Sequence, residues 1–201
     1  MEEARTQGGT SYDWFEPLYR QAGRNITEIP WAKLHPHPAL VSWFQNHTVP
    51  VVGRTGLVVG CGLGDDAEFI QKLGYLTTAF DVAPGAIEWC QSRFPRSPVS
   101  YEVGDLFTWS DGADLVIEHR TVQALPLELR TQAINQVCAL VNPSGLLIVI
   151  TNTRPTETPP EGPPWPLSPQ EIGQFHQGSL SLMETIAIEE NHGMLVFKNQ
   201  V

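Results

Sequence analysis

The chain has 201 residues, 41% of them apolar and 17% charged, which is enough for one domain that buries a core without disulfide or metal cross-links. Its formal net charge of −10 argues against nucleic acid or an anionic membrane as a partner, because both bind basic surfaces. There is neither an apolar run that could cross a bilayer nor the pattern of a signal peptide. Three scattered cysteines (Cys61, Cys90 and Cys138) favour reduced core residues. We therefore expect a cytoplasmic protein, monomeric or weakly dimeric, without a metal site.

The first 50 residues differ in pattern from the rest of the chain. Residues 11–22 and 37–46 have helical periodicity, and the loop between them contains Pro30 and Trp31. We expect residues 1–50 to form a helical arm, or cap, on a core made by residues 51–201, so that the whole chain is one domain.

A repeating strand–helix pattern runs from Thr55 to Ile150. Short apolar runs alternate with helical patterns, which is typical of βαβ units and a mostly parallel sheet. The predicted strands cover residues 56–59, 75–80, 99–103, 114–117 and 146–150, the predicted helices begin near Asp65, Pro84 and Pro126, and a turn is expected at residues 142–145. The last of these helices is expected to reach Val141. Trp43 and Trp89 are assigned to the core.

Proline is concentrated after the fifth predicted strand, where seven of the 17 prolines lie between Pro155 and Pro169. A short helix at about 169–177 and two strands, at about 180–189 and 193–198, follow this loop of residues 154–169. Residues 191–193 are typical of a hairpin turn. The chain is thus expected to be an α/β protein with a Rossmann-like fold, which has a mostly parallel seven-stranded sheet, helices on both faces and a C-terminal antiparallel hairpin.

Three alternate glycines, Gly60, Gly62 and Gly64, stand between the first strand and its helix. They predict a tight turn over which a nucleoside can lie, but their spacing differs from the dinucleotide fingerprint. Asp65 and Asp66 follow at once. Two carboxylates at this helix N-terminus would repel a pyrophosphate and attract the ammonium and sulfonium charges of S-adenosylmethionine. The alternative is that either aspartate only caps the helix.

Two more acids follow strands on the same side of the predicted sheet. Asp81 comes 17 residues after Gly64, the spacing expected of a carboxylate that accepts both ribose hydroxyls, and Asp105 is placed to accept the adenine amino hydrogen. Each acid alone is more typical of a turn or a cap. In this order after the glycines they predict S-adenosylmethionine as cofactor, with S-adenosylhomocysteine as product.

At this point the sequence resembles class I methyltransferases of the thiopurine and thiol/halide S-methyltransferase group over nearly its whole length. The resemblance rests on Trp14, Pro30–Trp31, Val59–Asp66, Phe80–Ala83, Gly104–Trp109, Glu118–Arg120, Ala124–Arg130 and Gly162–Trp165. All class I enzymes share the cofactor segments, whereas the Pro-Trp and Gly-Pro-Pro-Trp segments are more selective for this group.

The resemblance implies roles for individual residues. For the cofactor it implies Trp14, Trp31, Gly60, Cys61, Gly62, Gly64, Asp65, Asp81, Val82, Asp105, Leu106 and Glu118. For the methyl acceptor it implies Trp31, His119, Arg120, Pro164 and Trp165. The catalytic candidates are Glu118, His119 and Arg120. Trp14, Trp31 and Trp165 would wall the site with aromatic faces, which attract a sulfonium by cation–π contact.

Each assignment has a structural alternative. Glu118 could be a plain carboxylate at a helix start, and Arg120 could hold an acidic group of the substrate or pair with Glu118, which we favour. His119 stands where relatives carry Arg or Tyr, so it could accept or orient a proton near neutral pH. His35 and His37 lie in a loop that prolines restrict. We favour a surface position for them over a metal site, because the sequence offers no third ligand.

The predicted activity is methyl transfer to a small acceptor, with a thiol, a halide or another soft nucleophile as first choice. Such a transfer needs little proton handling, and positioning with exclusion of water supplies most of the acceleration. The alternatives are a small-molecule O- or N-methyltransferase with His119 as base, and a protein that binds S-adenosylmethionine without turnover. We expect the proline-rich loop to be a stiff lid that holds Trp165 over the pocket.

Overall fold

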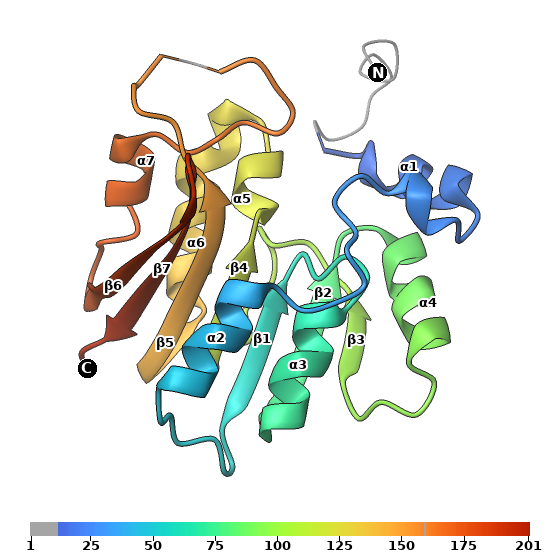
Figure 1. Ribbon diagram of the computed structural model, residues 1–201, viewed down its shortest axis with the longest axis horizontal. Helices are drawn as coiled ribbons and strands as arrows, with labels where there is room; N and C mark the ends of the chain where they lie inside the picture. The colour runs from blue at the N-terminus through green and yellow to red at the C-terminus, as the bar shows by residue number, and fades with distance from the viewer. Residues whose placement is uncertain (1–11, 159) are drawn as a thin grey trace.

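The computed structural model describes residues 12–158 and 160–201 (Figure 1). Its centre is a seven-stranded sheet in the order β3-β2-β1-β4-β5-β7-β6. The strands are β1 (Thr55–Val59), β2 (Leu76–Asp81), β3 (Ser100–Val103), β4 (Ala113–His119), β5 (Val141–Asn152), β6 (Leu180–Glu189) and β7 (His192–Asn199). Strands β1 to β5 run parallel to one another, and β7 is antiparallel to β5 and β6. The predicted Rossmann-like architecture with its C-terminal hairpin is confirmed.

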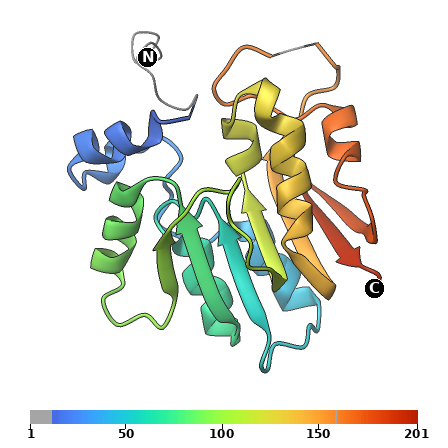
Figure 2. The same ribbon diagram turned by 180° about the vertical axis from the view of Figure 1, so that it is seen from behind.

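Helices cover both faces of the sheet, as Figures 1 and 2 show from opposite sides. On one face lie α2 (Pro38–Asn46) and α3 (Asp65–Leu73), and on the other lie α5 (Thr121–Ala124) and α6 (Arg130–Ala139). Successive residues of a strand point to opposite faces, so Leu57 packs in the α6 cluster and Val58 in the α2–α3 cluster. Successive side chains near the carboxyl end of a strand therefore lie alternately on the face covered by α2 and α3 and on the face covered by α5 and α6.

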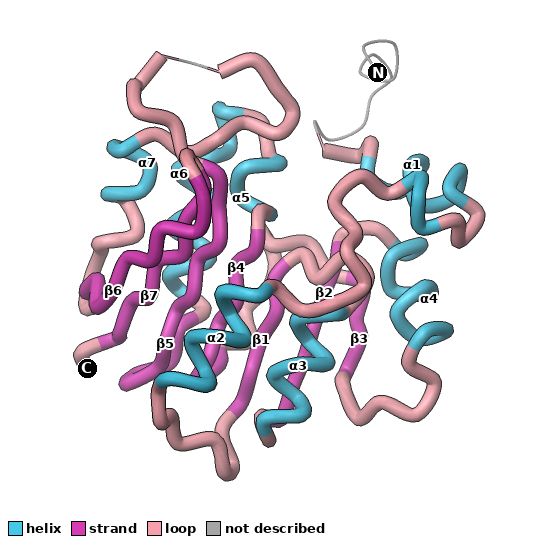
Figure 3. The backbone as a smooth tube through the Cα atoms, in the orientation of Figure 1, coloured by secondary structure: helices cyan, strands magenta, loops and turns pink. Residues whose placement is uncertain are grey.

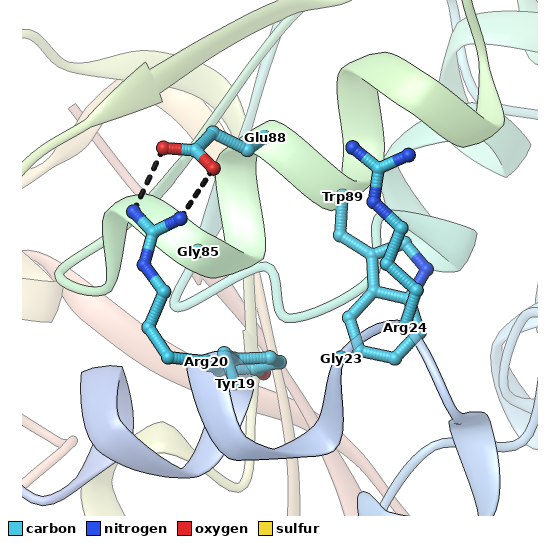
Figure 4. A pocket seen from close by; sticks show the side chains of 7 residues that line it. All are labelled: Tyr19, Arg20, Gly23, Arg24, Gly85, Glu88 and Trp89. Carbon is cyan, nitrogen blue, oxygen red and sulfur yellow. Dashed lines mark hydrogen bonds and ion pairs between the residues drawn. The ribbon is translucent and has the colours of Figure 1, made fainter.

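The N-terminal arm packs on α4 (Pro84–Arg93), which follows β2. Its helices are α1 (Phe15–Ala22) and the short 3-10 turn Ile26–Glu28. Figure 4 shows Arg20 of α1 reaching Glu88 of α4 with two nitrogen–oxygen contacts of 2.5 and 2.8 Å. Glu16 accepts a hydrogen bond of 2.7 Å from the backbone N–H of Gly85, at the start of α4. In the structure the helix that was predicted at residues 11–22 begins at Phe15. The contacts of Arg20 and Glu16 hold it against α4.

The predicted tryptophan and cysteine environments are confirmed. Trp43 and Trp89 are buried, with 5% and 6% of their surface exposed. All three cysteines are free thiols, Cys90 and Cys138 buried and Cys61 half-buried.

The helix predicted from Pro126 is not one continuous α-helix. The chain forms a 3-10 turn over Leu127–Leu129 and then α6 from Arg130, and the short helix α5, which was not predicted, precedes Pro126. Pro126 itself has extended backbone, with ψ of 150°, so helical structure stops before it and restarts after it. Val141 already belongs to β5, which also takes in the turn expected at residues 142–145.

The C-terminal elements differ from prediction only at their ends. The helix α7 (Pro169–Gly173) is shorter than the expected 169–177. The hairpin turn lies between the paired residues Glu189 and His192, one residue earlier than expected. Asn191 provides the positive φ of 60° that this turn requires, since asparagine tolerates the left-handed region.

Candidate active site

A cavity of about 930 Å³ lies at the carboxyl ends of β1, β2 and β4, the edge where open α/β sheets bind ligands. It is lined by the N-terminal arm, the glycine loop, the ends of these strands and the proline-rich loop. Figures 1 and 3 show the arm and the proline-rich loop beside the same edge of the sheet. Residues far apart in the sequence therefore enclose one space.

The glycine loop after β1 leaves room for a ligand at one position only. Gly60, Gly62 and Gly64 all have positive φ, of 57°, 55° and 85°. A Cβ at Gly60 would lie 2.3 Å from Thr121 Oγ1, and one at Gly64 would lie 2.6 Å from Tyr101 Oη. At Gly62 the nearest atom would be Tyr19 Oη, at 3.5 Å. The outer two glycines thus allow close packing of the loop, while Gly62 is open to the cavity.

The two aspartates after the loop are paired with other side chains. Asp65 accepts two hydrogen bonds from Arg93, of 2.7 and 3.0 Å. Asp66 accepts from His119 at 2.8 Å and from the backbone N–H of His37 at 2.8 Å. Neither carboxylate caps α3, whose N-cap residue is Gly64, so the N-cap alternative is wrong. The pairing of Asp65 also weakens the expectation that two unpaired carboxylates meet the cofactor here.

Asp81, at the end of β2, is a buried acceptor on the cavity wall. Its Oδ2 accepts from the N–H of Gly62 and its Oδ1 from the N–H of Ala83, both at 3.0 Å. Burial raises its pKa to about 6, and the two backbone hydrogen bonds oppose that rise. A carboxylate oxygen can accept two hydrogen bonds, so each oxygen keeps capacity for one more donor. This arrangement suits a pair of hydroxyl groups.

Asp105, after β3, is partly engaged by the arm. Its Oδ1 accepts from the N–H of Phe107 at 2.9 Å, and its Oδ2 accepts from Tyr12 Oη at 2.7 Å. Asp105, Leu106 and Val82 all line the cavity, and their contact with the cofactor stays a prediction.

The aromatic wall comes from the arm more than from the proline-rich loop. Trp14 and Trp31 line the cavity with their rings edge to face at 6.0 Å. Trp31 donates to Tyr19 Oη at 3.2 Å, whereas the buried Nε1 of Trp14 has no hydrogen-bond partner within the described residues. Pro163 and Pro164 also line the cavity but Trp165 does not, so the prediction that Trp165 walls the site is not supported.

Trp165 holds the loop through its backbone. Its N–H donates to Gln123 O at 2.8 Å, and its carbonyl accepts from Arg130 at 3.1 Å. Arg130, with only 2% of its surface exposed, also contacts Glu171 at 3.2 Å. The proline-rich loop is thus anchored to the α5–α6 side of the sheet.

The three catalytic candidates follow one another at the end of β4 but lie in different surroundings. Glu118 is fully buried on the face opposite His119 and does not line the cavity, because adjacent residues of a strand point to opposite faces. Its Oε1 accepts from the N–H of Val122 at 2.9 Å, and its Oε2 has no partner among the described residues. Burial raises its pKa to about 7. The prediction that Glu118 faces the cofactor or substrate is therefore wrong for this conformation.

Arg120 does line the cavity, but its predicted pairing with Glu118 is wrong. Its Nη2 lies 3.3 Å from Asn152 Oδ1 and 3.3 Å from His192 Nε2. Its backbone has a φ of 63°, which turns the chain sharply from β4 into α5. Arg120 therefore lies between β4, β5 and β7.

Three histidines meet beside it, a cluster that sequence reasoning missed. The His37 ring lies edge to face against His119 at 5.0 Å and against His192 at 5.3 Å. His37 is half-buried and caps α2 by accepting from Ala39 N–H at 3.2 Å, so its predicted surface position is wrong, whereas His35 is exposed at the cavity rim. No short-range sequence pattern predicts that these histidines meet. They come together because β4 and β7 lie on either side of β5 in the sheet.

The part of the chain that the structure describes shows neither a metal-binding cluster nor a membrane-spanning helix. No group of three or more His, Cys, Asp or Glu residues has the arrangement of a metal site. No helix there has the length and apolar character that a membrane span requires.

Comparison with known proteins identifies the family. Residues 57–145 match a family described as a methyltransferase domain. A thiopurine S-methyltransferase of Vibrio vulnificus is 30% identical over 162 residues, which cover 69% of this chain and 71% of that protein. The chain belongs to the class I S-adenosylmethionine-dependent methyltransferases.

A second relative and a solved structure show how much of the chain is similar in sequence and how much in fold. A thiopurine S-methyltransferase of Vibrio campbellii is 30% identical over 102 residues, so the match covers 50% of this methyltransferase and about half (47%) of the relative. The magnesium protoporphyrin IX methyltransferase of Synechocystis superposes with a TM-score of 0.73 at 14% identity, over 94% of this chain and 97% of that chain. At that identity the likeness concerns the fold.

The cavity of this methyltransferase fits S-adenosylmethionine. Its volume lies within the range of small-molecule sites, about 300–1,000 Å³. Asp81 offers acceptors for ribose hydroxyls, Gly62 allows close approach, and the buried Nε1 of Trp14 is a donor with no partner among the described residues. The three clustered histidines line the same cavity.

Proposed function

We propose that this methyltransferase transfers a methyl group from S-adenosylmethionine to a small, soft acceptor, with a thiol as the first choice. The observation that carries the proposal is that one cavity of about 930 Å³ is lined by Asp81, by Trp14 and Trp31 of the arm, and by Pro163 and Pro164 of the proline-rich loop. A space of that size admits a nucleoside and a small second molecule together.

Different residues of the cavity bind the cofactor and exclude water. Asp81 accepts ribose hydroxyls, and Asp105 accepts the adenine amino group in exchange for, or beside, its hydrogen bond with Tyr12. When bound, S-adenosylmethionine supplies a methyl group activated by a sulfonium. Trp14 and Trp31 surround the reacting centre with aromatic faces, which stabilise positive charge and displace water from a soft nucleophile. Holding both partners in one dry space supplies most of the acceleration.

The experiment begins with S-adenosylhomocysteine and ends with an acceptor panel. Isothermal titration should give saturable binding of S-adenosylhomocysteine, and mass spectrometry should detect methylated product from thiols. Iodide, phenols and small amines complete the panel. The absence of both heat and thermal shift with S-adenosylhomocysteine would refute the cofactor assignment. Saturable binding without methylation of any acceptor would instead favour a protein that binds S-adenosylmethionine without turnover.

An O- or N-methyltransferase is the second candidate. It is favoured by one observation, the imidazole of His119 in the cavity with a carboxylate behind it. Turnover of phenols or amines with none of thiols would replace the first proposal with this one.

A further inference from the structure

Asp66 and His119 form a carboxylate–imidazole pair that lines the cavity at the carboxyl end of β4, two strands away in the sheet from β2 and its Asp81. Asp66 Oδ2 lies 2.8 Å from His119 Nδ1. Because an ionised carboxylate can only accept, Nδ1 must carry the hydrogen, which leaves Nε2 of a neutral His119 as an acceptor. Within the described residues Nε2 makes no hydrogen bond, and His119 lines the cavity with 27% of its side chain exposed. The free nitrogen is thus available to a molecule in the cavity.

The surroundings keep Asp66 ionised. Burial alone would raise its pKa, but the hydrogen bonds and charges of His119 and His37 outweigh burial, and the net effect lowers the pKa of Asp66. Only 11% of its side chain is exposed. Its second oxygen is held by the N–H of His37 at 2.8 Å, so both oxygens are fixed by contacts with other elements. The carboxylate therefore holds the His119 ring in one orientation.

Burial and neighbouring charges disfavour a proton on the other two histidines. The pKa of His37 is lowered to about 4 by burial first and then by the charge of His119. The pKa of His192 is lowered by burial and by Arg120, partly offset by Glu189. The charged or titratable groups around His119 are thus Asp66 on α3, His37 before α2, Arg120 after β4, His192 and Glu189 at the hairpin, and the adjoining Glu118, which is buried on the other face of β4. Asp66 is the one that contacts its ring as a hydrogen-bonding anion.

We propose, on the basis of the function proposed above, that His119 is a general base oriented by Asp66, and that the acceptor is a protonated nucleophile, a thiol, rather than a halide. The S–H proton passes to His119 Nε2 while the sulfur lone pair forms the new bond to the methyl carbon. The bond between that carbon and the sulfonium breaks, and its electron pair stays on the sulfur that leaves as a neutral thioether. His119 then carries the proton beside Asp66 and releases it to water, to which its ring is open.

A halide has no proton to remove, so an Asp–His pair would be idle in a halide methyltransferase. General-base catalysis contributes about 10²- to 10⁴-fold when the acceptor is largely protonated. Its contribution vanishes when the thiol is already ionised. The dependence of the methylation rate on the acidity of the acceptor therefore shows directly whether the Asp66–His119 pair acts as a general base.

The test compares His119→Gln and Asp66→Asn with wild type on alkyl thiols, acidic thiophenols and iodide. For alkyl thiols we expect kcat/KM to fall about 100-fold in His119→Gln and about 10-fold or more in Asp66→Asn, with partial rescue in Asp66→Glu. For acidic thiophenols and iodide the fall should be less than about threefold. Wild type should show an acid limb in its pH profile for alkyl thiols, and His119→Gln should instead follow the ionisation of the thiol.

His47 provides a matched control in the same chain. It also faces a carboxylate, Glu184 at 3.4 Å, but it is on the surface and outside the cavity, so His47→Gln should leave every rate unchanged. Equal losses for all acceptors in His119→Gln, or no loss for alkyl thiols, would overturn the general base. Wild type that binds S-adenosylhomocysteine and methylates iodide faster than any thiol would overturn the acceptor class. Failure of wild type to bind S-adenosylhomocysteine would refute the proposed function itself.

Discussion

Replacement of Glu118 by glutamine tests the energetics of the buried carboxyl behind the cavity. Glu118 is fully buried, and one of its oxygens lacks any partner in the described structure. Burial raises its pKa from 4.5 to about 7. The folded state therefore favours the protonated carboxyl, and its stabilising contribution is complete below pH 4.5 and lost as the pH rises through 7.

The size of this effect follows from the two pKa values. The difference between 4.5 and about 7, at about 1.4 kcal/mol for each pH unit, makes the total loss about 3 kcal/mol. About 2 kcal/mol of it falls between pH 5.5 and 8.5, a window above the range where ordinary carboxyl groups titrate. Glutamine cannot ionise, so Glu118→Gln should remove this part of the pH dependence, whatever constant cost its unpaired amide adds.

Urea unfolding of wild type and Glu118→Gln across this window measures the effect. The stability of wild type minus that of the variant should fall by about 2 kcal/mol from pH 5.5 to 8.5. Asp114→Asn is a suitable control, because hydrogen bonds to Thr55 and Arg54 outweigh the effect of burial and lower the pKa of Asp114. Its contribution is already complete above pH 5, so its difference curve should be flat. An equally flat curve for Glu118→Gln would refute the raised pKa and the reasoning from burial.

Three further predictions concern the cavity wall and the loop that closes it. Asp81→Asn should weaken S-adenosylhomocysteine binding about 30-fold by titration calorimetry, because an amide cannot accept from both backbone donors and two hydroxyls as a carboxylate does; affinity within twofold of wild type would contradict that role. Joint replacement of Pro163 and Pro164 by glycine should lower kcat/KM for the acceptor about tenfold through loss of loop stiffness, with S-adenosylhomocysteine affinity within twofold, and equal losses of both would count against a lid. Arg130→Met should cost about 3 kcal/mol in urea unfolding, because it removes a buried donor from the Trp165 carbonyl and from Glu171. Arg154 also lies 2.9 Å from Glu171, and a cost below about 1 kcal/mol would show that Arg154 alone satisfies Glu171.

The strand and helix pattern was predictable because it depends on local periodicity. Alternating apolar runs and helix starts from Thr55 to Ile150 correctly predicted the parallel sheet, and the glycines and acids after successive strands predicted the edge that carries the cavity. Errors arose at Pro126, after which the one predicted helix is a 3-10 turn followed by α6, and at β5, which begins at Val141. Pro126 can begin a helix or interrupt one, and the residues around it do not distinguish these cases.

The side-chain pairing at the site could not be predicted, because it depends on which elements become neighbours. Asp66 meets His119, 53 positions later, and the His37 ring meets His119 and His192. Sequence motifs placed Glu118 and Trp165 in the site, but strand alternation buries the first on the opposite face and loop anchoring keeps the second out of the cavity. The direction of a side chain at a strand end is fixed by register, which a motif does not encode.

The sequence by itself thus determined the fold, the family resemblance, the cofactor and the edge of the sheet that carries the cavity. These depend on backbone periodicity, turn residues and strand-end acids that stay close in the chain. Only the tertiary structure decided that Asp65 is paired with Arg93, that Glu118 is withdrawn, and that Asp66, His119 and two further histidines meet in one cavity. Such contacts join α2, α3, β4 and β7, and the sheet order that joins them is a property of the folded core.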